Sequence, residues 1–219
     1  MEKSKQKGAK AFGFLFFIVP PAEAGLCQMF CGSGVREIVF SVLFTMFFCG
    51  TAIFYLGRFK GWLERRPYYR QVIFICTGVG LPFAFFYGAY KLPPIFYLGA
   101  VLIAALVELS AGFLFCAGFW AIAALNCEES NLEAVTLLML GIVLCLLAGF
   151  LKEKRYIFRI LVLGSIVTAI LYFLRTGSFD REALLILGRE LFATAAIQGS
   201  AALFIHLYLT ILRRKRSYL

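Results

Sequence analysis

One acidic residue of this 219-residue chain lies deep inside an apolar stretch. Glu108 stands thirteen residues after the start of segment 95–125 and seventeen before its end. A charged acid at the centre of a membrane helix costs about 2.5–3.5 kcal/mol to insert. We therefore expect the Glu108 carboxyl to be neutral, to be paired, or to face a polar cavity. Its chemistry would be proton or cation coupling, or contact with a cationic substrate; the alternative is a structural acid at a helix break.

A second set of polar residues recurs every four positions near the C-terminal end: Glu190, Thr194, Gln198 and His206, with Ala202 between the last two. On a helix this spacing keeps the residues near one face. Such a face could line the pathway of a substrate or ion, with His206 as the titrating group. The alternative places Glu190 among lipid headgroups and lets His206 reach the nearer interface. Gln198 reaches neither interface, so it is the stronger candidate.

The motifs that the sequence lacks limit other chemistry. It contains no GxxxxGK[ST], HExxH or GxSxG motif, and His206 is its only histidine. The usual ligands for nucleotide, catalytic metal and haem are therefore missing, and we expect no cofactor and no bound metal. Classical hydrolase chemistry is disfavoured as well. Whether the chain is an enzyme stays open, with the balance against it.

The composition indicates that membrane helices must position these residues. Hydrophobic side chains make up 62% of the chain and charged ones 16%, against about 45–50% and about 25% in soluble domains. Such a chain cannot cover itself with polar surface, which excludes a soluble globular protein, a disordered chain and a nucleic-acid-binding domain. We predict an all-α, polytopic transmembrane helix bundle that forms a single integral membrane domain over residues 1–219.

Polar residues divide the chain into apolar segments of membrane-spanning size. The segments are 11–30, 38–56, 71–90, 95–125, 134–151, 160–174 and 191–212. About 20 residues cross the hydrocarbon core, so segment 95–125 is too long for one perpendicular span and too short for two. We predict about six spans, with one short, broken or re-entrant segment. Residues 183–188 are expected to form a separate interfacial helix before the last span.

Two other places predict irregular helices. Gly78, Gly80 and Pro82 within segment 71–90 predict a kink or break, and thus a hinge. The Pro20–Pro21 pair could break the first segment at mid-depth. Residues 1–24 also resemble a secretory signal, with a basic start, an apolar run and a small-x-small ending. We favour a short first span or a re-entrant segment over a cleaved signal.

Basic clusters between the apolar segments predict the topology, because Lys and Arg mark cytoplasmic loops. The N-terminal lysines, segments 58–70 and 152–159, and the tail 213–216 all favour one side. We therefore expect both termini in the cytoplasm of a cell with the chain in its inner (plasma) membrane. Three segments separate 58–70 from 152–159, which is an odd number. Either one basic loop breaks the rule, or a segment within 71–151 does not cross as a simple span. Segment 95–125 corrects the count if it enters and returns, or if part of it pairs with a half-span from 71–90. Seven basic residues are expected at lipid headgroups: Arg58, Arg65, Arg66, Arg213, Arg214, Lys215 and Arg216.

Together these features favour a small permease or transporter subunit for a small solute or lipid-like molecule. Glu108, Gln198, His206, Glu190 and Thr194 would line its pathway. Membrane lipids surround it, and a cytoplasmic ATPase, other membrane subunits or a second copy would complete it; nucleic acid is not an expected partner. The alternatives are an enzyme embedded in the membrane, acting on a lipid or polyprenyl substrate through Glu190 and His206, and a non-catalytic membrane scaffold.

Overall fold

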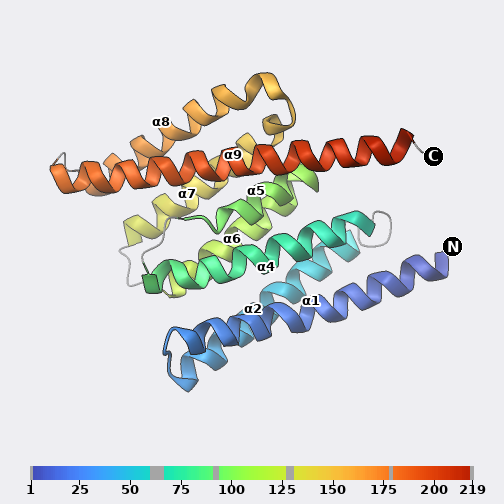
Figure 1. Ribbon diagram of the computed structural model, residues 1–219. Coiled ribbons are helices and arrows are strands. Elements are labelled where there is room, and N and C mark those ends of the chain that lie inside the picture. Colours follow the sequence, from blue (N-terminus) through green and yellow to red (C-terminus); the bar gives the residue numbers. More distant parts are fainter. Residues whose placement is uncertain (1, 60–66, 91–93, 127–130, 178–179, 218–219) are drawn as a thin grey trace.

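The computed structural model describes residues 2–59, 67–90, 94–126, 131–177 and 180–217, and every regular element among them is helical (Figure 1). Six helices are long and apolar enough to cross a membrane. They are α1 (Glu2–Phe30), α2 (Val35–Phe54), α4 (Pro67–Tyr90), α7 (Asn131–Ala148), α8 (Ile157–Thr176) and α9 (Arg181–Ser217). Two shorter apolar helices, α5 (Tyr97–Leu106) and α6 (Leu109–Leu125), lie between α4 and α7. The predicted all-α membrane bundle, with six spans and one broken segment, is confirmed.

The broken segment is a helical hairpin formed by α5 and α6. The helix stops at Val107 and restarts after Glu108, whose backbone is extended at φ −164° and ψ 152°. A Cβ placed on Gly112 would stand 2.3 Å from the Cβ of Ala104, so the two helices return along each other in backbone contact. Helix α5 begins beside the middle of α4, where a Cβ on Gly99 would meet the Cys76 carbonyl oxygen. At about 1.5 Å per residue, its 10 residues rise about half the hydrocarbon thickness from there toward the other end of the bundle. Helix α6 then returns along it, which is consistent with the count of basic loops.

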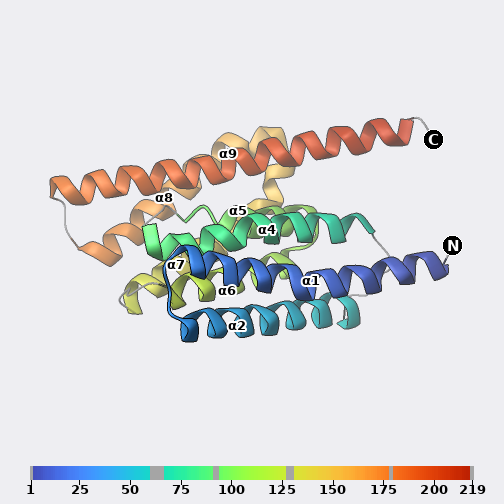
Figure 2. The same cartoon turned by 60° about the horizontal axis from the view of Figure 1, so that its bottom comes forward.

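This hairpin gives the bundle a consistent topology. Figure 1 places the start of α1 and the end of α9 at one end of the bundle, and Figure 2 agrees. We call this the basic end, because the short helices η1 (Tyr55–Phe59), η2 (Gly149–Lys152) and η3 (Lys154–Tyr156) close it together with the basic segments predicted to share one side. The opposite end is the distal end. Arg65 and Arg66 lie outside the described residues, as do the side chains of Arg58, Arg213, Arg214, Lys215 and Arg216.

The α5–α6 hairpin also lies at the centre of the bundle. Both views place α9 on one side of it and α1 with α2 on the other (Figures 1 and 2). Small residues allow the close approach: a Cβ on Gly99 would meet the Cys76 carbonyl oxygen at 2.5 Å, and one on Gly118 would meet the Phe48 ring at 2.2 Å. Aromatic side chains such as Phe115 fill the space between these contacts and are fully buried. Without a hydrophobic force between helices in lipid, such close packing is what holds them together.

Two expected helix breaks are absent. Helix α1 continues through Pro20 and Pro21, and helix α4 continues through Pro82. Membrane helices tolerate such prolines because neighbouring groups satisfy the freed carbonyls. The predicted breaks there are therefore wrong, while a kink of α4 at Pro82 stays a prediction.

The glycines of α4 serve packing instead. A Cβ on Gly80 would stand 2.7 Å from the Phe119 ring, whereas one on Gly78 would meet open space. Gly80 thus lets α6 approach α4 closely. Whether Gly78, Gly80 and Pro82 act as a hinge during motion stays a prediction.

The last helix differs from the expectation as well. Helix α9 is one continuous element of 37 residues, about 55 Å long at 1.5 Å per residue. Its first turns belong to the bundle, because Ala183 and Leu187 are buried against Tyr172 of α8. The prediction of a separate interfacial helix at 183–188 is therefore wrong. Every polar residue of the four-residue repeat therefore lies on one continuous helix.

Candidate functional site

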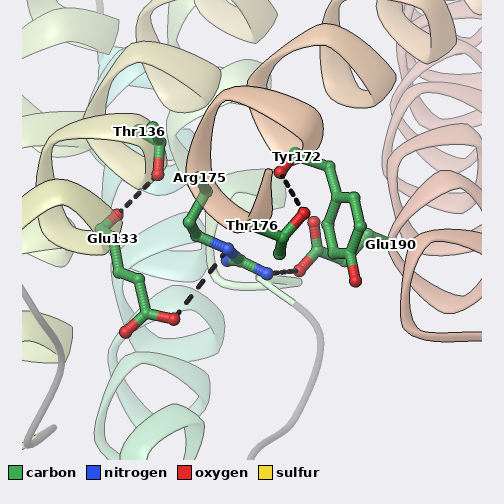
Figure 3. Close-up of polar contacts among 6 residues, drawn as sticks. All are labelled: Glu133, Thr136, Tyr172, Arg175, Thr176 and Glu190. Atoms are coloured by element: carbon green, nitrogen blue, oxygen red, sulfur yellow. Dashed lines mark hydrogen bonds and ion pairs between the residues drawn. The ribbon is translucent and has the colours of Figure 1, made fainter. Parts of the chain in front are cut away.

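The polar repeat of α9 begins with an ion pair at the distal end. Arg175, in the last turn of α8, donates from Nη2 to the Glu190 carboxylate at 2.7 Å (Figure 3). The Arg175 Nε lies 3.9 Å from a carboxylate oxygen of Glu133 on α7, which is an ion pair too long for a hydrogen bond. The Arg175 and Glu190 side chains are only 16% and 18% exposed. This cluster ties three helices together where they reach the distal end.

Local structure explains why Arg175 and Glu190 meet. Helix α8 ends at Gly177, which has a positive φ of 60° and donates its N–H to Phe173 O at 2.9 Å. Asp180 then caps α9 by accepting the Ala183 N–H at 2.7 Å. A basic residue just before such an end also interacts favourably with the helix dipole. Helix α9 runs back along α8, which brings the two charges together.

The next contact along the interface joins two threonines. The Thr168 and Thr194 hydroxyl oxygens lie 3.0 Å apart, and both residues are fully buried. Thr168 also donates to the Gly164 carbonyl at 2.8 Å. A hydroxyl has one proton, so Thr194 is the donor in the bond between the two helices. The chain of hydrogen bonds therefore runs from α9 into the backbone of α8.

Gln198 follows one turn later and makes a different contact. It is 1% exposed, yet neither its amide nitrogen nor its amide oxygen has a hydrogen-bond partner among the described residues. A Cβ on Gly164 would stand 2.2 Å from its Nε2, so the amide lies directly on the backbone of α8 near mid-span. The Gly164 carbonyl already accepts the Thr168 hydroxyl. Burying an amide unpaired costs about 1–3 kcal/mol.

The contacts of Glu190, Thr194 and Gln198 with α8 form a polar row, and a small cavity lies at its distal side. Its volume is about 20 Å³, and polar groups of four helices line it: Tyr87, Thr136, Thr168, Tyr172, Arg175 and Glu190. A space of this size holds about one water molecule. The polar row therefore has room for one water molecule on the distal side of Thr168, whereas packing fills the space around Gln198.

The structure thus brings together three of the five residues predicted to line a pathway. Glu190, Thr194 and Gln198 occupy one buried face of α9 against α8. His206 is two turns further along, half-buried, and its Nε2 is buried without a hydrogen-bond partner among the described residues. The structure confirms one shared face for Glu190, Thr194 and Gln198, while the place of His206 on that face and the roles of all these residues stay predictions.

Glu108 lies elsewhere. It occupies the tip of the α5–α6 hairpin, is half-buried, and accepts the Ser110 hydroxyl at 3.0 Å. Leu106, two residues before it, shares a cavity with Tyr68 at the start of α4, and α5 packs against η2. The hairpin therefore carries Glu108 toward the basic end rather than to mid-depth, and the cavity beside Thr168 is not lined by it. Its predicted coupling role stays untested.

The sequence reasoning missed the residues of α8 and α7 that complete the site. Arg175 falls just outside the predicted segment 160–174, although Gly164, Thr168 and Arg175 repeat at spacings close to one and two helical turns. Arg175, Thr168 and Gly164 of α8 face the repeat of α9 in reverse order, because the two helices are antiparallel and joined by a short turn. That complementarity was the available signal. Glu133 gave none, because only the packing of α7 brings it near Arg175.

Fold and interior together define the class: an α-helical protein that spans the membrane several times and buries a polar row between its last two helices. No protein-family model, no curated protein and no solved structure matches the chain.

Proposed function

We propose that the chain is a permease subunit in which the α8–α9 interface carries a small, uncharged, hydrogen-bonding solute across the membrane. The observation that carries the proposal is Gln198, a mid-span amide that is 1% exposed and has no protein partner for either polar atom among the described residues. An amide can both donate and accept, so it can pass a polar solute between the threonines and the basic end. Its cost in the closed state is repaid when a solute binds.

The distribution of charge supports an uncharged solute. Arg175 and Glu190 lie at the distal mouth of the row, and the described contacts beyond them come from the Thr168–Thr194 pair and Gln198. An ion at mid-span would find no counter-charge there, and a bare charge in a membrane interior is costly. Hydroxyl and amide groups instead match the hydrogen bonds that a neutral solute loses when it leaves water.

The geometry gives the enzymatic alternative less support. Glu190 and His206 lie sixteen residues apart on the continuous helix α9, which is about 24 Å at 1.5 Å per residue. An acid–base pair must approach within about 3 Å, so these two residues do not act on one bond together. A scaffold would need an outward face of small residues to pack against another membrane protein, yet Gly112 and Gly118 are buried inside the bundle.

Several parts of the proposal rest on the sequence pattern. The basic end would face the cytoplasm from the inner (plasma) membrane, following the positive-inside rule. A cytoplasmic ATPase, another membrane subunit or a second copy of the chain would complete the pathway. Glu108 and His206 would serve at the basic end, where a solute leaves or enters.

Swelling of reconstituted vesicles tests the proposal. The purified chain in liposomes is mixed with excess glycerol, urea or erythritol, and light scattering records solute entry. We expect at least one solute to enter faster than in protein-free liposomes. The gain should vanish in Gln198→Met and persist in Ala196→Met, because Ala196 lies on the exposed face of the same helix. Equal rates in native and Gln198→Met vesicles, or no gain for any of the three solutes, would overturn the proposal.

A further inference from the structure

Two apolar cavities flank helix α4 near the basic end. One, of about 260 Å³, lies between α4, α5 and α9, with Leu102, Leu106 and Phe204 among its lining residues. The other, of about 450 Å³, lies between α1 and α4, with Phe12 and Leu15 in its wall. Gln71 and Ile75 of α4 line both cavities and separate one from the other. The exposed face of α4 therefore lies between these two neighbouring apolar cavities, which we call the two channels.

Polar groups lie at the basic end of both channels. Arg70 lines the α1 side, where a Cβ on Gly8 would stand 2.7 Å from its Nη1, so the guanidinium rests on the backbone of α1. None of the ion pairs among the described residues involves Arg70. On the α9 side, Tyr208 lines the cavity, and its hydroxyl is buried without a hydrogen-bond partner among the described residues. Gln71, exposed between them, adds an amide.

We propose that this place binds one anionic phospholipid, with its phosphate on Arg70 and Gln71 and one acyl chain in each cavity, astride Ile75. Arginine recognises phosphate with paired, charge-assisted hydrogen bonds, and Arg70 has its donors to spare. The Tyr208 hydroxyl would reach the polar ester region of the lipid. This site is separate from the α8–α9 row and does not depend on the proposed function.

The shape of the site selects this occupant over a protein partner. A docking helix is about 10–12 Å wide with its side chains and would need one continuous groove. Here Ile75 divides the apolar surface into two channels, which suits two slender chains. The unpaired cation at their common end requires an anionic head, so a zwitterionic lipid fits less well and a free phosphate leaves the channels unfilled.

Lipid titration of the purified full chain tests the site. The chain in neutral detergent is titrated with dioleoylphosphatidylglycerol or dioleoylphosphatidylcholine, and native mass spectrometry counts the bound lipids. We expect the anionic lipid to bind tighter, and Arg70→Gln to weaken it about tenfold through the lost charge-assisted bonds. Arg36→Gln is the matched control, because Arg36 is an exposed arginine at the start of α2, at the distal end.

A second arm tests the acyl channels. Leu102→Trp fills the cavity between α4, α5 and α9 and should weaken the lipid while leaving the charge of Arg70 in place. Glycerol phosphate, added as the free anion, should not compete. Equal affinity of the two lipids, native affinity in both Arg70→Gln and Leu102→Trp, an equal loss in Arg36→Gln, or full competition by glycerol phosphate would each overturn the proposal.

Discussion

Replacing Gln198 by methionine should make the protein more stable while it removes the proposed function. Methionine has nearly the length of glutamine and adapts its shape, so it can occupy the same space on Gly164 without a buried amide. The Gln198 amide has no partner among the described residues, and burying such a group costs about 1–3 kcal/mol. The free energy of unfolding of Gln198→Met should therefore rise by about 1–3 kcal/mol.

A second buried glutamine provides the matched control. Gln28 is 4% exposed, but its Nε2 donates to the Ser41 hydroxyl at 2.9 Å and to Asn126, and its Oε1 accepts the Ser33 hydroxyl. Gln28→Met leaves these three partners unsatisfied and should lower the free energy of unfolding by about 1–3 kcal/mol.

Both variants are unfolded by SDS in mixed detergent micelles, with helical circular dichroism as the signal. Shifts of opposite sign support the reasoning. If both substitutions destabilise the protein to a similar extent, the Gln198 amide has structural partners, and its assignment as a solute contact fails.

Other substitutions test the neighbouring contacts. Arg175→Met should lower the free energy of unfolding by about 1–3 kcal/mol because it leaves the Glu190 carboxylate unpaired; the double variant Arg175→Met/Glu190→Met should recover most of it, and additive losses in the double-mutant cycle would contradict the ion pair. Gly164→Ala should cost about 1–3 kcal/mol, since its Cβ would meet the Gln198 amide at 2.2 Å, and Gln198→Ala should rescue it; SDS unfolding without rescue would count against this packing. Gly112→Val should abolish folded protein in gel filtration, because the added Cβ meets the backbone of the facing helix; a normal yield would mean that the hairpin is not packed as described.

Much of the fold follows from the sequence because the bilayer limits the choices. A run of about 20 apolar residues must be a helix, since lipid offers no partner to the backbone. The count of basic loops then indicated that segment 95–125 could return, and the Gly112 contact shows how it does so. The position of Glu108 did not follow, because a depth judged from segment length assumes a straight helix.

Prolines and glycines were the least informative signals. Pro20, Pro21 and Pro82 lie inside continuous helices, because the neighbours that satisfy their freed carbonyls are not visible in the sequence. The start of α9 had the same difficulty: Gly188 and the charges that follow it look like a helix boundary, but the packing of Leu187 on α8 carries the helix through.

Only the α9 half of the candidate site could be predicted from the sequence. The four-residue repeat placed Glu190, Thr194 and Gln198 on one face, and the structure confirms that face. Its partners on α8 came from tertiary packing, which sets the register between two antiparallel helices. That Gln198 lacks a hydrogen bond is a property of this register and has no signature in the sequence.

Reaction of a cysteine at position 198 with a water-soluble thiol reagent tests the central claim most directly. Thiols react as thiolates and therefore need contact with water. In a background in which the seven native cysteines are replaced, Gln198→Cys in proteoliposomes should react with a small, uncharged methanethiosulfonate. Ala196→Cys, on the exposed face of the same helix, should stay unmodified in lipid. Protection at both positions, under conditions where an exposed distal-end cysteine reacts fully, would show that the α8–α9 row is dry and structural.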